Sequence, residues 1–262
     1  MKYPPLTVAL LMLASHVLPA SATAQTKGQK RTDESAEQES QIPEPLETYK
    51  GRTIAQTMHY LGAEWLIRDE REREERCSLM VANLGVERGM TVCDMGCGNG
   101  FYALQLAKLV GEQGQILAVD VQPEMLKFLR ERAEKAGVEN ITPILGSFHA
   151  PRLPRDSCDL ILMVDVYHEF SHPEHMLKAM RDALKPDGLI ALLEYRMEDP
   201  DVPIKLLHKM SKRQIMKEYK PNGFKLVKEF DKLPWQHMMF FGKDESFDKR
   251  RTASEDSKGE EK

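Results

Sequence analysis

A glycine-rich turn between a short apolar strand and an amphipathic helix constrains this chain more than any other feature. The segment runs from Thr91 to Ala107, TVCDMGCGNGFYALQLA, and contains three alternating glycines: Gly96, Gly98 and Gly100. Glycines at such a strand-turn-helix junction let a ligand approach the backbone closely, near the positive end of the helix dipole. The segment therefore predicts a nucleotide-like ligand.

An acidic residue, Asp94, lies two positions before the first of these glycines. A dinucleotide-binding fold needs unneutralised helix N–H groups for its pyrophosphate, whereas an acidic group beside the turn suits a cationic ligand. S-adenosylmethionine, with its ammonium and sulfonium charges, is such a ligand. The pattern D-x-G-x-G-x-G, in place of G-x-G-x-x-G, thus favours S-adenosylmethionine over a dinucleotide.

Short apolar strands alternate with helices in the rest of the chain. Beyond the first strand, the strands are expected at Ile116–Asp120, Ile141–Leu145, Leu160–Val164 and Leu189–Glu194, and a turn at Lys185–Gly188 precedes the last. The helices are expected at 123–136, 172–184 and 211–220, and a closing hairpin at 224–230 and 236–241. This alternation predicts an α/β fold with a doubly wound parallel sheet, covered on both faces.

Four acidic residues fall at or just beyond the carboxyl ends of the predicted strands: Asp94, Asp120, Asp165 and Glu194. Ligands of such sheets bind outside those ends. Asp94 is expected to hold the ligand's ammonium, directly or through water, and Asp120 to accept hydrogen bonds from its ribose hydroxyls. The predicted cofactor site comprises Asp94, Gly96, Cys97, Gly98, Gly100, Asp120, Val121, Ser147 and Asp165.

These motifs resemble those of the class I S-adenosylmethionine-dependent methyltransferases. VCDMGCGNG is similar to their motif I, ILAVDVQPEML to the following acidic motif, and DLILMVDVYHEF and LKPDGLIALLEYR to their fourth- and fifth-strand segments. The resemblance implies a Rossmann-like sheet of seven mostly parallel strands with a C-terminal antiparallel hairpin. One departure concerns the adenine, because many relatives have an acidic residue after the third strand, where this chain has Gly146-Ser147-Phe148-His149. Ser147 or a backbone group is expected to substitute.

The methyl acceptor is expected to be a small molecule. Enzymes that methylate nucleic-acid amino groups typically carry an Asn/Asp-Pro-Pro-aromatic run after the fourth strand, where this chain has DVYHEF (165–170). The net charge of −4 and pI near 6.1 also argue against a nucleic-acid partner. The chain looks more like enzymes of the ubiquinone-biosynthesis kind than like arsenite methyltransferases, which need several thiolates near the sulfonium. Oligomeric state is left open.

Candidate catalytic residues follow the fourth predicted strand. Methyl transfer from a sulfonium draws mainly on proximity, and a base is needed only when the nucleophile starts protonated. The candidates are His168, Tyr167 and Glu169, and His168 comes first because its unperturbed pKa lies nearest neutrality. A purely structural histidine is the alternative at this position. Glu194, Tyr195 and Arg196 after the fifth strand are the next candidates, and His59, His208 and His237 are weaker ones.

The four cysteines, Cys77, Cys93, Cys97 and Cys158, are too few and too scattered for a disulfide framework. Cys93 and Cys97 have a C-x3-C spacing with no second pair and no nearby histidine cluster, so they do not predict a zinc site. No metal site is expected.

The N-terminus differs from the rest of the chain. Lys2 precedes an apolar run from Leu6 to Leu18, shorter than the ~20 residues needed to cross a bilayer, and Ala22-Thr23-Ala24 resembles a cleavage site. We interpret residues 1–24 as a signal peptide, which predicts export and no stable membrane span after cleavage; an uncleaved membrane anchor is the alternative. Residues 25–48 read as a disordered linker, 49–242 as the methyltransferase domain with a helical N-terminal lid, and 243–262 as a disordered charged tail.

Two segments before the glycine turn also carry predictions. Arg68–Arg76 is an unbroken charge run, which predicts one long helix ending at Gly85, with most charges on a solvated face. Met58–Leu66 is aromatic enough to fold over the mouth of the site as a lid.

The sequence is compatible with two alternative functions. One is a non-catalytic S-adenosylmethionine-binding or regulatory protein on the same fold. The other is a nucleotide-dependent oxidoreductase, which Asp94 disfavours.

Overall fold

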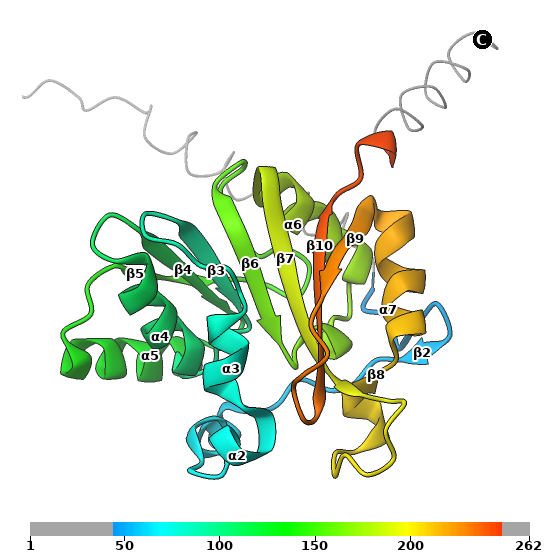
Figure 1. Ribbon diagram of the computed structural model, residues 1–262, viewed down its shortest axis with the longest axis horizontal. Helices are drawn as coiled ribbons and strands as arrows, with labels where there is room; N and C mark the ends of the chain where they lie inside the picture. Colours follow the sequence, from blue (N-terminus) through cyan, green and yellow to red (C-terminus); the bar gives the residue numbers. More distant parts are fainter. Residues whose placement is uncertain (1–43, 248–262) are drawn as a thin grey trace, which may run out of the picture. The chain divides into compact units, whose positions relative to one another are not determined.

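The computed structural model describes residues 44–247, in which one central sheet carries helices on both faces (Figure 1). The strands β3 to β7 that form its parallel part are Thr91–Met95, Gln115–Asp120, Ile141–Leu145, Cys158–Val164 and Leu184–Arg196. The order across the sheet is β5-β4-β3-β6-β7-β10-β9, where β9 (Phe224–Glu229) and β10 (Gln236–Lys243) form an antiparallel hairpin and β10 pairs with β7. The prediction of a mostly parallel, Rossmann-like, seven-stranded sheet is confirmed, and a short eighth strand, β8 (Lys209–Met210), extends it beside β7.

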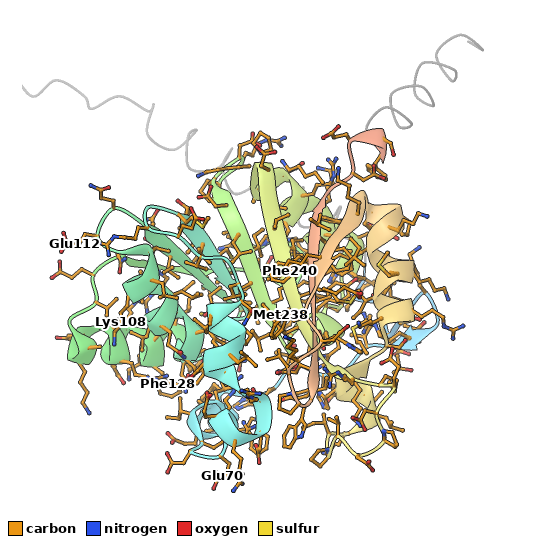
Figure 2. The ribbon with its side chains drawn as sticks, viewed as in Figure 1. Glu70, Lys108, Glu112, Phe128, Met238 and Phe240 are labelled. Atoms are coloured by element: carbon orange, nitrogen blue, oxygen red, sulfur yellow. The ribbon has the colours of Figure 1, made fainter. Side chains whose placement is uncertain are left out.

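Successive residues of the central strands face two separate cores. Met238 and Phe240 of β10, labelled in Figure 2, pack in the core that includes α3 (Cys77–Ala82), α4 (Phe101–Val110) and α5 (Pro123–Ala136). Met239 and Phe241 pack in the opposite core with α6 (Pro173–Ala183) and α7 (Lys212–Tyr219). The strands read as nearly continuous apolar runs because both of their faces are buried. The doubly wound arrangement is thus confirmed.

Helix boundaries follow the local signals in the sequence. α5 begins at Pro123 and ends before Gly137, which adopts a left-handed φ of 64°. The Ser211 hydroxyl accepts a hydrogen bond from the Gln214 backbone N–H at 3.1 Å and so caps α7, as expected.

The prediction of one long helix from Arg68 is wrong. The segment forms two short helices, α2 (Arg71–Glu75) and α3, and the chain breaks between them at Arg76, with a left-handed φ of 52°. The Glu72 carboxylate accepts a hydrogen bond from the Ser78 backbone N–H at 2.9 Å, which helps to start the second helix. Arg71 and Glu75 are buried and pair at 2.7 Å instead of lying on a solvated face.

The fifth parallel strand is longer than expected. β7 begins at Leu184, which pairs with Cys158, whereas Leu160 pairs with Leu189. The predicted turn residues between these pairs therefore form an irregularity inside the strand.

Before this sheet, β1 (Thr48–Tyr49) and β2 (Arg52–Thr53) form a small hairpin. None of the helices within residues 44–247 has both the length and the apolar character that a bilayer span requires. The predicted signal peptide, most of the predicted linker and the tail beyond 247 lie outside the described residues.

Candidate active site

A cavity of about 570 Å³ lies at the carboxyl ends of the parallel strands. Its walls come from the ends of β3, β4, β6 and β7 and from the segment after β5, as expected for a ligand site in such a sheet. Residues before the sheet and the loop after β7 complete it; both lie at the lower end of the sheet in Figure 1. Six of the nine predicted cofactor residues line it: Gly96, Gly98, Asp120, Val121, Ser147 and Asp165.

The glycine turn is held against the end of β4. One Asp120 oxygen accepts from the Gly98 N–H and the other from the Gln122 N–H, each at 2.9 Å. Gly96 has a φ of 69°, and a Cβ there would lie 2.4 Å from the Val166 side chain. Only glycine fits at this position. The turn therefore presents bare backbone to the cavity beside a fixed carboxylate.

The other three predicted cofactor residues lie behind the cavity wall. Cys97 is buried, and a Cβ on Gly100 would meet Leu129 Cδ1 at 2.1 Å, so this glycine serves the close packing of α5. Asp94 is buried in β3, where desolvation raises the pKa of its carboxyl to about 7. Its Oδ2 is buried without a hydrogen-bond partner. This oxygen lies beside the turn but outside the cavity lining, so a cationic ligand group in the cavity would reach it through a water that supplies the missing donor.

A chain of three side chains runs along the opposite end of the cavity. His168 Nδ1 lies 2.7 Å from Glu194 Oε2, and His168 Nε2 lies 3.0 Å from His208 Nδ1. The other Glu194 oxygen accepts the His168 backbone N–H at 3.1 Å, which fixes the residue at two points. Burial alone would lower the pKa of His168, but the Glu194 carboxylate outweighs it, so this pKa is raised. Burial and the neighbouring His168 lower the pKa of His208.

The two neighbours of His168 differ in their placement. Glu169 lines the cavity, accepts a hydrogen bond from the Met58 N–H at 3.2 Å, and has its pKa raised to about 7 by burial. Tyr167 points away into the core, where its hydroxyl donates to Glu218 at 2.8 Å. The structure therefore brings His168 and Glu169 to the cavity and does not bring Tyr167 there.

The segment before the sheet, for which a lid is predicted, contributes to the cavity wall. Met58, Trp65 and Leu66 line it, the last two from the 3-10 helix η1 (Tyr60–Ile67). The Gln122 side-chain amide holds this segment. Its Nε2 donates to the Met58 carbonyl at 2.9 Å, and its Oε1 accepts from the Tyr60 N–H at 2.8 Å.

Two further networks at the cavity were not foreseen. Arg71 lines it and pairs with Glu75, which also accepts from the Tyr195 hydroxyl at 3.0 Å. Asp165, with a left-handed φ of 53°, accepts from the Gln236 amide at 2.6 Å, and burial raises the pKa of its carboxyl well above the usual range. Arg71 and Glu75 belong to the charge run Arg68–Arg76, but nothing in that run indicated that they would be buried.

Comparison with known proteins agrees with this arrangement. A family model described as a methyltransferase domain matches residues 86–248, more than half of the chain. The chain is 28% identical over 156 residues to the ubiquinone/menaquinone biosynthesis C-methyltransferase of Azotobacter vinelandii, covering 57% of this chain and 61% of that one. It is 32% identical over 112 residues to the protein of the same name from Citrobacter koseri, covering 42% and 45%. The matches thus span less than two thirds of these relatives' length.

A solved structure described as a SAM-dependent methyltransferase from Aquifex aeolicus has a TM-score of 0.67 and 25% identity, and the match covers 71% of this chain and 98% of that one. A putative O-methyltransferase from Nostoc punctiforme shares the fold, with a TM-score of 0.59 and 18% identity over 70% of this chain and 59% of that one. The family match, the strand order and the acidic glycine turn all agree. The chain belongs to the class I S-adenosylmethionine-dependent methyltransferases.

Proposed function

We propose that this protein transfers a methyl group from S-adenosylmethionine to a small-molecule acceptor. The observation that carries the proposal is that one cavity joins two chemically different ends. One end has the bare glycine turn and Asp120, and the other has His168, Glu169 and His208 beside apolar side chains.

At the first end, the chain's residues bind and orient the cofactor. Gly96 and Gly98 would let its methionine part lie against the backbone, Asp120 would accept from its ribose hydroxyls, and Asp94 would supply a negative charge to its ammonium. S-adenosylmethionine supplies an electrophilic methyl on a sulfonium. The lid residues Trp65 and Leu66 would exclude water from the reacting atoms.

At the second end, the apolar side chains favour an uncharged or aromatic acceptor, and His168 would take its proton. The apolar lining near these residues includes Phe170, Pro203 and Ile204. Because the Glu194 carboxylate accepts from His168 Nδ1, the second ring nitrogen, Nε2, is the atom that would act as the base, in exchange for its hydrogen bond with His208 Nδ1. The curated relatives are named as C-methyltransferases of ubiquinone and menaquinone biosynthesis, which supports a hydroxylated ring as the acceptor class.

Calorimetry of the purified protein against S-adenosylhomocysteine and NAD tests the cofactor, and a metabolite screen with labelled methyl donor tests the acceptor. We expect S-adenosylhomocysteine to bind and NAD not to bind. Binding of NAD alone would overturn the proposal. Binding of S-adenosylhomocysteine with no methyl transfer to any hydroxylated aromatic in the screen would favour the non-catalytic alternative.

We also propose that the chain is exported, on the strength of its first 24 residues. N-terminal sequencing of the mature protein should then begin near Gln25. A protein that keeps Met1 and is recovered from the cytosolic fraction would contradict export.

A further inference from the structure

Three side chains at the acceptor end form a cluster of potential metal ligands: His168, Glu169 and His208. One ligand atom from each lies within 4.8 Å of the other two. His168 and Glu169 are held by η2 (Tyr167–Glu169), and His208 ends η3 (Leu206–His208). All three line the cavity. The cluster thus combines two imidazoles and a carboxylate from two separate segments.

The hydrogen bonds of His168 suit a metal ligand. Its Nδ1 donates to Glu194 at 2.7 Å, and its Nε2 shares one proton with His208 Nδ1 at 3.0 Å, which a bound metal ion would displace to solvent. Metal-ligating histidines almost always donate their second ring N–H to a carboxylate or carbonyl in this way. Glu194 is therefore a positioning residue for a ligand as well as for a base.

The spacing fits a small divalent cation. In a tetrahedral site, metal–ligand distances of about 2.0–2.2 Å place neighbouring ligand atoms roughly 3.3–3.6 Å apart. The two histidine nitrogens lie 3.0 Å apart, and His168 Nε2 lies 4.0 Å from Glu169 Oε1. Side-chain shifts of about half an ångström would therefore bring these atoms to ligand spacing.

The charges around the cluster also favour a cation. Glu169, Glu194 and Asp165 are close enough to affect His168 electrostatically. The Glu169 side chain is only 11% exposed, and it accepts a hydrogen bond from the Met58 backbone N–H. A buried carboxylate held without a full counter-charge is costly, and a bound cation would remove that cost.

We propose that His168, Glu169 and His208 bind one divalent transition-metal ion, of the zinc class, in the acceptor end of the cavity. Two imidazoles with one carboxylate suit such ions, whereas magnesium and calcium prefer all-oxygen ligands. Three protein ligands leave a coordination position facing the cavity, as in catalytic zinc sites. An acceptor hydroxyl that occupies this position would be oriented toward the methyl donor. It would also lose its proton to water more readily. The ion would then take over the role given to His168 as base. This use of the ion rests on the proposed methyl transfer, but its binding does not.

The test is metal titration of the purified, chelator-treated protein, with Zn²⁺ and Mg²⁺ by calorimetry and with Co²⁺ by its visible absorption. We expect one equivalent of Zn²⁺ or Co²⁺ to bind, with little response to Mg²⁺. His208→Ala and Glu169→Gln should each weaken binding at least tenfold. His175→Ala, which removes an exposed histidine of α6, should leave it unchanged.

Thermal melting of each variant checks that it is folded, and His168→Ala is avoided because that side chain is buried against Glu194. Absence of stoichiometric Zn²⁺ and Co²⁺ binding, or equal affinity in His208→Ala and the unsubstituted protein, would overturn the metal site. S-adenosylhomocysteine binding in the same samples is measured separately. A protein that binds the cofactor analogue but no metal loses this inference alone, and one that binds metal but no analogue loses the proposed function alone.

Discussion

The two ends of the cavity are built in different ways. The cofactor end centres on the stretch 94–122, in which Asp120 and the glycine turn are joined through backbone N–H groups, and Ser147 and Asp165 add to it. The acceptor end is built from side chains far apart in the chain, since His168, Glu194 and His208 come from three different segments. The first end depends on backbone conformation and the second on tertiary packing. Substitutions at the two ends should therefore fail in different ways.

The largest effect should separate chemistry from binding. His168→Ala should reduce turnover by about 10²–10⁴-fold, because it removes the group that handles the acceptor's proton. The affinity for S-adenosylhomocysteine should stay unchanged, since His168 belongs to the other end of the cavity. Because His168 is buried against Glu194, thermal melting first checks that the variant is folded. Steady-state rates and calorimetry on the same preparation then measure turnover and affinity, with His175→Ala as the surface control. Turnover at the unsubstituted rate would exclude His168 from the reaction.

The next effect concerns stability, because Arg71 at the cavity wall depends on a buried partner. Glu75→Ala should lower the free energy of unfolding by about 3–5 kcal/mol, since it leaves Arg71 buried and unpaired. Urea denaturation measures this loss. Arg73→Ala removes an exposed charge from the same helix and should change stability by less than about 0.5 kcal/mol. Similar small losses in both variants would mean that the buried pair is not what anchors this segment.

At the cofactor end, Asp120→Ala should weaken S-adenosylhomocysteine at least tenfold, or about 1.4 kcal/mol. The carboxylate both fixes the turn and faces the cavity, so its removal affects the backbone and the ribose contact together. Asp120→Asn keeps one acceptor oxygen and should lose less. Calorimetry with full affinity in the alanine variant would remove Asp120 from the cofactor site.

A pH series distinguishes the role of Asp94. Burial raises its pKa to about 7 in the protein without ligand, so the carboxyl is protonated below that pH and charged above it. The ammonium of S-adenosylhomocysteine prefers the charged form of Asp94. The affinity for this ligand should therefore rise with pH through about 7, by at most about tenfold per pH unit, and then level off. Calorimetry at about pH 6 and pH 8 tests this. Asp94→Asn should flatten the profile; a profile unchanged in that variant would mean that another group titrates.

This contrast also explains what could be predicted from the sequence. The order of apolar strands and the acidic glycine turn are local patterns. They were enough to predict the sheet and the position of Asp120 at the cavity. The burial of Arg71 and Glu75 depends on the break at Arg76, which no propensity marks in an otherwise helical charge run. The meeting of His208 with His168 depends on the path of the loop after β7, which has no regular pattern. Parts of a site that follow local sequence patterns can be predicted from the sequence, whereas parts that depend on tertiary packing cannot.

The smallest expected effect tests, at two adjacent residues, whether packing decides which side chains take part in the reaction. Tyr167 stands next to His168, yet its hydroxyl binds Glu218 in the core, where Arg52 also pairs with Glu218 at 2.9 Å. Tyr167→Phe should cost about 1 kcal/mol of stability, because Glu218 keeps its other partners. Turnover per folded molecule should stay unchanged, since the hydroxyl does not reach the cavity. Thermal melting with rate measurements well below the melting temperature separates the two quantities. A loss of turnover with normal stability would place Tyr167 in the reaction and would show that adjacency to His168, not packing, decides its role.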